Sequence, residues 1–222
     1  LLFYLTLNRF FNVTFYFVNT FLNSTFYLTL DRFFYISLYS FNAIADAEMQ
    51  GALRDFVTSG SKKLVLDLRG NPGGYLQSAI SVSSYFLPAG KVVVRENFGA
   101  DQDEKVYRSS GRNLGSYSPD EIVILINQGS ASASEIVAGA LQEHGVATLI
   151  GETTFGKGSV QELVDLPGGA SLKVTVARWL TPNGTSISDG GLAPDIEIER
   201  TVEDITAGED PQLEAAIEYL NR

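Results

Sequence analysis

Three serines, Ser130, Ser132 and Ser134, lie where the sequence GSASASEIVAGAL changes from a loop into a helical pattern. A serine hydroxyl at a strand-to-helix turn faces the positive end of the helix dipole, where backbone N–H groups can stabilise an oxyanion. The same spacing also predicts a capping box, with Ser132 as the N-cap and Glu135 reaching back to it. The G-x-S-x-G signature of α/β-hydrolases is absent. The pattern therefore predicts a helix cap, a nucleophile or both, and a nucleophile needs a base.

His144 is the only histidine of the chain, and it is an unsuitable base. It stands at the far end of the helix that begins after Ser132, about 18 Å away at about 1.5 Å per residue. A histidine beside Gly145 at a helix C-terminus complements the helix dipole instead. The sequence therefore excludes a Ser-His-Asp triad and predicts a structural role for His144.

Lys157, in the stretch GETTFGKGSVQ, is the alternative base. A lysine can accept a serine proton when burial favours its neutral form. Gly156 and Gly158 allow the backbone to approach closely, and Phe155 offers an apolar side chain that could exclude water. The chain between Ser132 and Lys157 reads as helix, strand and tight turn, which returns the lysine to the sheet edge where the helix began. A Ser–Lys dyad is therefore predicted, with a solvated loop lysine as the alternative.

Two other lysine patterns fit their motifs poorly. GETTFGK resembles a phosphate-binding P-loop, but Gly158 stands where that motif needs Ser or Thr, and a strand pattern follows instead of a helix. Ser59 and Lys62 form an S-x-x-K sequence in a polar loop that lacks the helix required by the motif. Neither pattern predicts a second site.

The glycine-rich stretch RGNPGG follows a short apolar strand pattern. Gly73 and Gly74 would expose backbone N–H groups at the carboxyl end of that strand, where α/β sheets place their sites. Asp67 and Arg69 are expected to hold the turn by charge-assisted hydrogen bonds. An ordinary strand-to-helix turn without chemistry is the alternative interpretation.

The elements that must position these residues alternate along the chain. The patterns predict strands at 34–41, 63–68, 91–97, 121–127, 146–151 and 195–199, and helices at 45–60, 75–87, after Ser132 and at 210–222. Residues 98–120 are predicted as loop, and QELVDL and ASLKVTVARWL flank a PGG turn as a hairpin. We therefore expect an α/β fold with a mainly parallel sheet, flanking helices and an antiparallel hairpin annex.

Composition narrows the function classes. The chain of 222 residues has a formal net charge of −10 and contains no cysteine. It shows no basic stripe, so nucleic-acid binding is not expected. The absence of cysteine excludes disulfides and thiolate metal sites, and a single histidine argues against a histidine-based zinc site. We expect neither a metal nor a cofactor.

Residues 1–41 differ in composition from the rest of the chain. They hold ten of the 14 phenylalanines, and FYLTLNRFF at 3–11 returns as FYLTLDRFF at 26–34. Three interpretations stay open: a low-complexity segment foreign to the domain, β-hairpins packed on it, or a membrane-associated segment. We divide the chain into residues 1–34 without an assigned domain, a core at 35–200, and an acidic C-terminal segment with a helix at 201–222. The apolar stripe of that helix is expected to pack on the core.

Four stretches in this order, LVLDLRGNPGG, GSASASEIVAGAL, GETTFGKGSVQ and LTPNGTSISDGGLAPDIEI, resemble the carboxyl-terminal processing proteases, also called tail-specific proteases. The resemblance covers roughly residues 35–200 and implies a Ser–Lys endopeptidase with a crotonase-like (ClpP-like) core. It implies Ser132 as the nucleophile, Lys157 as the base and Gln161 as the residue that orients the lysine. It also implies an oxyanion hole formed by the N–H groups of Ala133 and of Gly73 or Gly74.

The resemblance further implies protein substrates with apolar C-terminal tails, and an exported location in the periplasm or at the cell surface. Family members usually carry a PDZ domain before the core, which residues 1–34 do not resemble. Membrane association and oligomerisation stay open. Two alternatives remain: an inactive peptide-binding or scaffolding homologue, and an acyl-CoA enzyme on a crotonase-like core, in which Lys157 would have no role.

Overall fold

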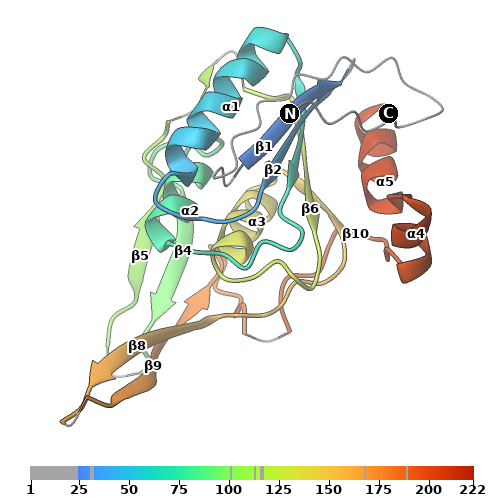
Figure 1. The fold of residues 1–222 in the computed structure, drawn as a ribbon. Coiled ribbons are helices and arrows are strands. Elements are labelled where there is room, and N and C mark those ends of the chain that lie inside the picture. Colours follow the sequence, from blue (N-terminus) through green and yellow to red (C-terminus); the bar gives the residue numbers. More distant parts are fainter. Residues whose placement is uncertain are drawn as a thin grey trace.

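The computed structural model describes residues 25–222 apart from 31, 32, 101, 113, 116, 117, 168 and 189. Its larger sheet has the strand order β1-β2-β3-β6-β7-β10 (Figure 1). β1 is antiparallel to β2, and every other neighbouring pair is parallel. The bounds are β1 Thr25–Leu30, β2 Phe33–Leu38, β3 Lys63–Asp67, β6 Glu121–Ile126, β7 Thr148–Gly151 and β10 Ile196–Glu197.

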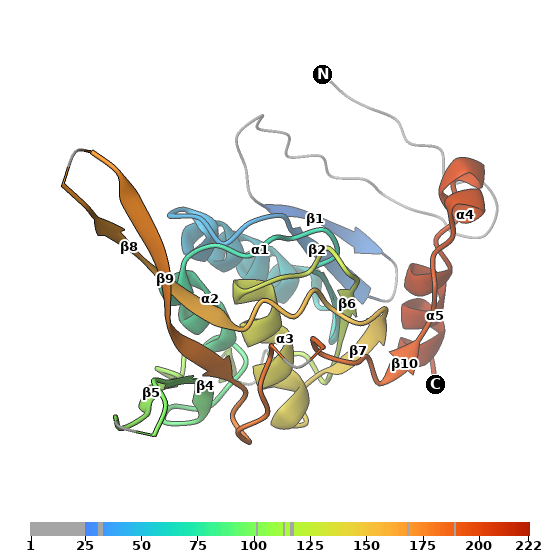
Figure 2. The ribbon, with the colours of Figure 1, turned by 90° about the horizontal axis from the view of Figure 1, so that it is seen from below.

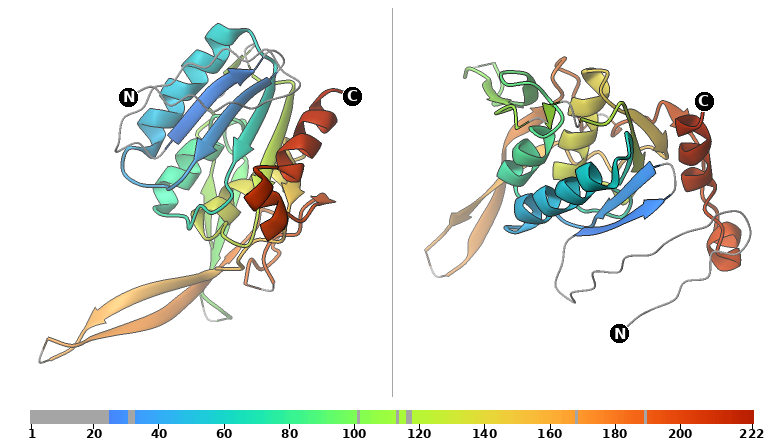
Figure 3. Two further views of the ribbon diagram at one scale, coloured as in Figure 1. Left: turned by 45° about the vertical axis from the view of Figure 1, so that its right-hand side comes forward. Right: turned by 90° about the horizontal axis from the view of Figure 1, so that it is seen from above.

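Helices cover both faces of this sheet, because its central strands are apolar on both sides. In β3 the side chains of Leu64 and Leu66 join the core beneath one set of helices, and Val65 joins a second core on the opposite face. The first face is covered by α1 Ala45–Ser59, α2 Leu76–Ser83 and α3 Ala133–Glu143. The second face is covered by α5 Pro211–Leu220, which follows the short helix α4 Val202–Ala207 (Figure 3).

A smaller antiparallel sheet has the order β5-β4-β9-β8. It contains β4 Val92–Asn97, β5 Lys105–Arg108, β8 Ser159–Asp165 and β9 Ser171–Leu180. The outer part of the β8–β9 hairpin, which we call the arm, extends well beyond the rest of the molecule (Figures 2 and 3). Val164 of β8 pairs with Leu172 of β9, and both side chains are exposed, Leu172 by 52%.

The fold class predicted from the sequence is confirmed: a mixed α/β fold with a mainly parallel sheet, flanking helices and an antiparallel annex. The predicted helix at 45–60 is observed as Ala45–Ser59, and Gly60 ends it in the left-handed conformation. The C-terminal helix packs on the core through buried Ala216 and Leu220, as expected. Prediction was wrong at β5, which forms inside the predicted loop 98–120 because it pairs with β4.

The N-terminal boundary also differs from the expectation. The sheet begins at Thr25, and the predicted start of the core at residue 35 falls inside β2. Phe33 and Phe34 are buried on opposite faces of the sheet, so this part of the aromatic segment contributes to both cores. The interpretation of β-hairpins therefore holds for the antiparallel strands β1 and β2, while residues 1–24, with the first copy of the repeat, lie outside the described residues. No described helix is long and apolar enough to span a membrane.

Candidate active site

Ser132 occupies the turn between β6 and α3, where it is the N-cap of the helix. Its φ of 57° and ψ of −112° make it the one described non-glycine residue with a positive φ. Such a conformation costs about 1–3 kcal/mol and persists only where surrounding contacts impose it. The two neighbouring serines are fully buried and bonded: Ser130 Oγ donates to the Leu68 carbonyl at 2.8 Å, and Ser134 Oγ donates to the Asn71 carbonyl at 2.9 Å. Of the three serines, only Ser132 is partly exposed.

The RGNPGG turn packs directly against Ser132. A Cβ built on Gly73 would lie 2.8 Å from Ser132 Cβ and 2.9 Å from the Ala133 nitrogen, so only glycine fits there. The Gly73 N–H already donates to Asn71 Oδ1 at 2.9 Å. Phe41 pairs with the chain on either side of Gly74, through the Gly73 carbonyl and the Tyr75 N–H, and this pairing directs the Gly74 N–H away from Phe41.

The backbone thus offers two candidate oxyanion donors, the N–H groups of Ala133 and Gly74. Neither N–H has a hydrogen-bond partner among the described residues. Ala133 is the first residue of α3, where backbone N–H groups lack partners within the helix and the dipole is positive. Of the two glycines predicted from the sequence, the geometry therefore favours Gly74 as the donor and Gly73 as the residue that allows close packing.

Glu135 joins the backbone of the candidate nucleophile to that of the candidate base. Its fully buried carboxylate accepts the Ser132 N–H on Oε2 at 2.7 Å, as the capping box predicts. The same Oε2 accepts the Lys157 N–H at 3.0 Å. Oε1 accepts the Gly156 N–H at 2.6 Å and the Thr154 hydroxyl at 2.6 Å. One carboxylate therefore fixes the two loops relative to each other, so the backbones of Ser132 and Lys157 lie close together.

The side chain of Lys157 does not have the burial that the sequence suggested. Lys157 is exposed, and Phe155, the expected apolar cover, is 66% exposed. Gln161 lies on β8 next to an irregularity in its pairing with β9, and its side chain is exposed as well. Within the described residues, no hydrogen bond joins the side chains of Ser132, Lys157 and Gln161. The backbone of Phe155 is held by the bond from its N–H to the Ser130 carbonyl at 3.0 Å, while its ring is left largely to solvent.

Comparison with known proteins identifies the family. The sequence pattern of peptidase family S41 matches residues 32–198. The chain belongs to peptidase family S41. It is 45% identical over 172 residues to a carboxy-terminal-processing protease of Bartonella bacilliformis, covering 75% of this chain and 39% of that protein. It is 40% identical over 181 residues to a carboxyl-terminal-processing protease of Synechocystis sp., covering 80% of this chain and 41% of that protein.

A solved structure shares the fold of this S41 chain. The photosystem II D1 C-terminal processing protease superposes with a TM-score of 0.72 at 31% identity, covering 81% of this chain and 49% of that one. The chain therefore spans about two fifths of the length of the two curated relatives and half of the solved one. The resemblance to carboxyl-terminal processing proteases is confirmed at the level of the family.

The remaining polar candidates lie outside this candidate site. His144 is the C-cap of α3, and its Nε2 lies 2.8 Å from the Val92 carbonyl, so its predicted structural role is confirmed. Ser59 Oγ bonds the Phe56 carbonyl at the end of α1. Gly158 begins the approach to β8 rather than a helix, and a Cβ built there would meet the Ser188 nitrogen at 2.4 Å. The chain is crowded at Gly158 and continues into a strand, so it does not form a P-loop.

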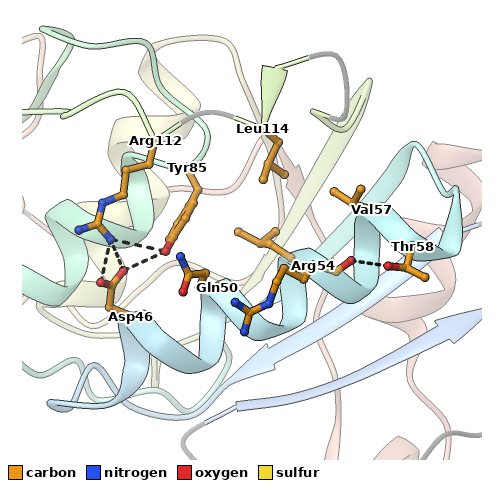
Figure 4. Close-up of a pocket in the computed structure, with 9 residues that line it drawn as sticks. Asp46, Gln50, Arg54, Val57, Thr58, Tyr85, Arg112 and Leu114 are labelled. Atoms are coloured by element: carbon orange, nitrogen blue, oxygen red, sulfur yellow. Dashed lines mark hydrogen bonds and ion pairs between the residues drawn. The ribbon is translucent and has the colours of Figure 1, made fainter.

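A groove of about 820 Å³ lies along α1 and contains none of the predicted site residues (Figure 4). Asp46 and Arg112 form an ion pair of 2.7 Å at one end of it, and Arg54 and Thr58 line the other.

Among the described residues, no group of three or more His, Asp or Glu side chains is placed to hold a metal ion. The candidate site is built from the β3–α2 turn, the β6–α3 turn and the loop before β8.

Two functional contributions were missed from the sequence. Glu135 was predicted only as a capping residue, because nothing local shows that the N–H groups of Gly156 and Lys157 also reach it. Asn71 was not singled out, although its buried side chain bonds the Leu38 carbonyl at 2.6 Å and the Gly73 N–H. The only local signal was the position of this asparagine in the RGNPGG turn, with Gly70 before it and Gly73 two residues after it.

Proposed function

We propose that this chain is a serine endopeptidase that cleaves proteins near their carboxyl terminus through an acyl-enzyme. The observation that carries the proposal is the bridge made by Glu135, whose carboxylate binds the backbone N–H groups of both Ser132 and Lys157. Such a bridge would hold the Ser132 hydroxyl and the Lys157 amine close enough for a proton to pass between them. Membership of family S41 supports the reaction class.

In the proposed mechanism, neutral Lys157 accepts the Ser132 proton while Ser132 Oγ attacks the scissile carbonyl. The resulting oxyanion is stabilised by the N–H groups of Ala133 and Gly74, at the positive end of α3. Lys157 then donates its proton to the leaving amine, and water hydrolyses the acyl-enzyme. Because Lys157 is exposed in the free protein, a substrate lying over it and Phe155 would supply the exclusion of water that the neutral amine needs.

Gln161 is proposed to orient Lys157 once substrate is bound. The proposed substrates are proteins with apolar C-terminal tails, and the proposed location is exported, in the periplasm or at the cell surface. Both follow from the family, and the names of the two curated relatives support processing at a carboxyl terminus.

The test is cleavage of a protein with an apolar C-terminal tail, with the products followed by mass spectrometry. We expect Ser132→Ala and Lys157→Ala to lose at least about 1,000-fold in kcat/KM, since each removes a reacting group. Lys173→Ala, at an exposed lysine on β9, is the matched control and should retain wild-type activity. Equal activity of Lys157→Ala and wild type would refute the dyad.

An inactive peptide-binding homologue is the second candidate. The exposed Lys157 side chain, which has no side-chain bond to Ser132 or Gln161, is the observation that favours it. Saturable binding of the tailed protein without turnover, by wild type with all three residues present, would support this function and exclude the first.

A further inference from the structure

Arg69, at the start of the RGNPGG turn, binds the C-terminal segment of the chain. Its guanidinium side chain is only 11% exposed. Nη2 donates to Asp67 Oδ2 at 2.6 Å, and Nε donates to the same carboxylate at 3.0 and 3.1 Å. Nη1 donates to Asp210 Oδ1 at 2.7 Å and to Gln212 Oε1 at 3.0 Å. All three guanidinium nitrogens are therefore bonded, and one of them, Nη1, binds residues 141 and 143 positions away.

The two C-terminal partners are themselves fixed. Asp210 is the N-cap of α5, where its carboxylate accepts the Leu213 N–H at 3.1 Å. Gln212 is buried, and its amide donates to Glu152 Oε1 at 3.1 Å and to the Ile198 carbonyl at 2.8 Å. Burial by itself would raise the pKa of Asp210, but the hydrogen bond and charge of Arg69, with smaller contributions from the Leu213 N–H and from Arg200 at 3.5 Å, outweigh it and lower that pKa. The start of α5 therefore presents a carboxylate and an amide oxygen in a fixed position.

The same network also reaches the RGNPGG turn, which supplies one of the proposed oxyanion donors. Asp67 Oδ1 accepts the backbone N–H of Arg69 at 2.9 Å, which sets the direction in which the chain leaves β3. Tyr35 donates its hydroxyl to Asp67 Oδ2 at 2.5 Å. The next residue, Gly70, donates its N–H to Asn127 Oδ1 at 2.9 Å, and the turn then brings Gly73 against Ser132. Hydrogen bonds and the backbone of the turn thus connect the start of α5 to Ser132.

We infer that Asp210 and Gln212 are positioning residues, which hold Arg69 and thereby orient the turn that supplies the Gly74 N–H. The inference rests on the proposed function of Ser132. Both residues lie beyond the stretch 32–198 that matches the family. In this inference the C-terminal segment therefore helps to hold the turn beside Ser132. Two carboxylates around one mostly buried guanidinium fix its plane, whereas Asp67 alone leaves Nη1 without a charged partner.

The decisive variant is Asp210→Asn. Asparagine caps helices as well as aspartate does, so α5 keeps its N-cap while Arg69 loses a charged partner. Leu220→Ala is the control, because it removes buried packing at the opposite end of α5 and touches neither Asp210 nor Arg69. We expect Asp210→Asn to lower kcat about 10- to 100-fold with KM within about twofold, as displaced oxyanion donors do. Leu220→Ala should keep kcat within about twofold of wild type wherever it is folded.

Two further measurements separate positioning from stability. A peptide aldehyde, which forms an oxyanion on Ser132, should bind Asp210→Asn about 10- to 100-fold more weakly, while the matching peptide alcohol should bind as it does to wild type. Hydrogen exchange of the peptide spanning residues 68–75 should be faster in Asp210→Asn and unchanged in Leu220→Ala.

Unchanged exchange and kcat in Asp210→Asn, or an equal loss of kcat in Leu220→Ala, would overturn the inference. If wild type neither cleaves the tailed protein nor binds the aldehyde more tightly than the alcohol, the proposed function fails instead. The exchange measurement then still decides whether Asp210 holds the turn, because it does not depend on activity.

Discussion

Glu135→Gln tests whether one carboxylate sets the geometry of the site. The substitution keeps the size of the side chain but turns one oxygen into an NH₂ group, which cannot accept. If the amide nitrogen takes the place of Oε1, the Thr154 hydroxyl can rotate to accept from it, but the Gly156 N–H loses its bond. If it takes the place of Oε2, the N–H groups of Ser132 and Lys157 both lose theirs. The first orientation is therefore favoured, with one buried N–H unpaired.

The expected loss of stability follows from the changes in these hydrogen bonds. An unpaired buried N–H costs about 1–3 kcal/mol, and each remaining bond falls from charge-assisted to neutral strength, about 1 kcal/mol less. With one bond lost and three weakened, we expect the free energy of unfolding to fall by about 4–6 kcal/mol. Displacement of Gly156 moves the adjacent Lys157, and a shift of about 1 Å at a reacting group can lower the rate about 100-fold. Activity should therefore fall by at least that factor in the folded protein.

The assay combines urea unfolding with kcat/KM below the unfolding midpoint. Glu143→Gln is the matched control: it lies on the same helix, and its carboxylate accepts the Thr181 hydroxyl at 2.6 Å and the Asn183 N–H at 2.7 Å. That variant should lose stability and keep its kcat. If Glu135→Gln retained kcat/KM within about threefold, or if both variants lost activity equally, the reasoning about the bridge would be refuted.

Three further predictions address the turn, the flanking serines and pH. Gly73→Ala should lower kcat about 100-fold or more, because its Cβ would lie 2.8 Å from Ser132 Cβ; Gly60→Ala, with a φ of 71° and no atom within 4 Å of its Cβ, is the control that should lose only stability. Ser134→Ala should lower the free energy of unfolding by about 1–3 kcal/mol through the Asn71 carbonyl while activity persists, and complete loss of activity would contradict the assignment of Ser132. The lowered pKa of Asp210 means that its pairing with Arg69 and Arg200 stabilises the fold above the unfolded-state pKa near 3.8, and that this contribution is lost as pH falls through the lower folded-state pKa. Urea midpoints measured from pH 7 to pH 3 should therefore fall more steeply in wild type than in Asp210→Asn, and parallel curves would contradict the pairing.

Local patterns in the sequence were sufficient to predict the parts of this fold that depend on neighbours in the chain. The helix at 45–59 has its apolar stripe and its glycine stop within sixteen residues, and the capping box of Ser132 spans four. The pairing of β1 with β2 could not be derived in this way, because a repetitive aromatic segment carries no unique register. β5 was missed for a similar reason, since its polar residues become a strand only through β4.

The candidate site likewise contains some features that local sequence predicts and others that depend on the complete fold. The residue types needed at 132, 133, 73 and 157 follow from chemistry and from the turns that hold them. The exposure of Lys157 and the fourfold use of Glu135 depend on how the loop before β8 returns to α3, and no local spacing encodes that path. Arg69 was expected to hold its own turn, but its bonds to Asp210 and Gln212 link positions that only the complete fold brings together.

The arm has a consequence for the behaviour of the protein in solution. β8 is an edge strand of its sheet, and the outer half of the hairpin exposes Val164 and Leu172 side by side. An edge with unpaired backbone groups and apolar side chains is a template for pairing with another chain. The flanking charges of Asp165 and Lys173 counteract such pairing at low concentration. The arm therefore offers an edge for pairing between two folded copies of the chain, without exposure of the buried sheet.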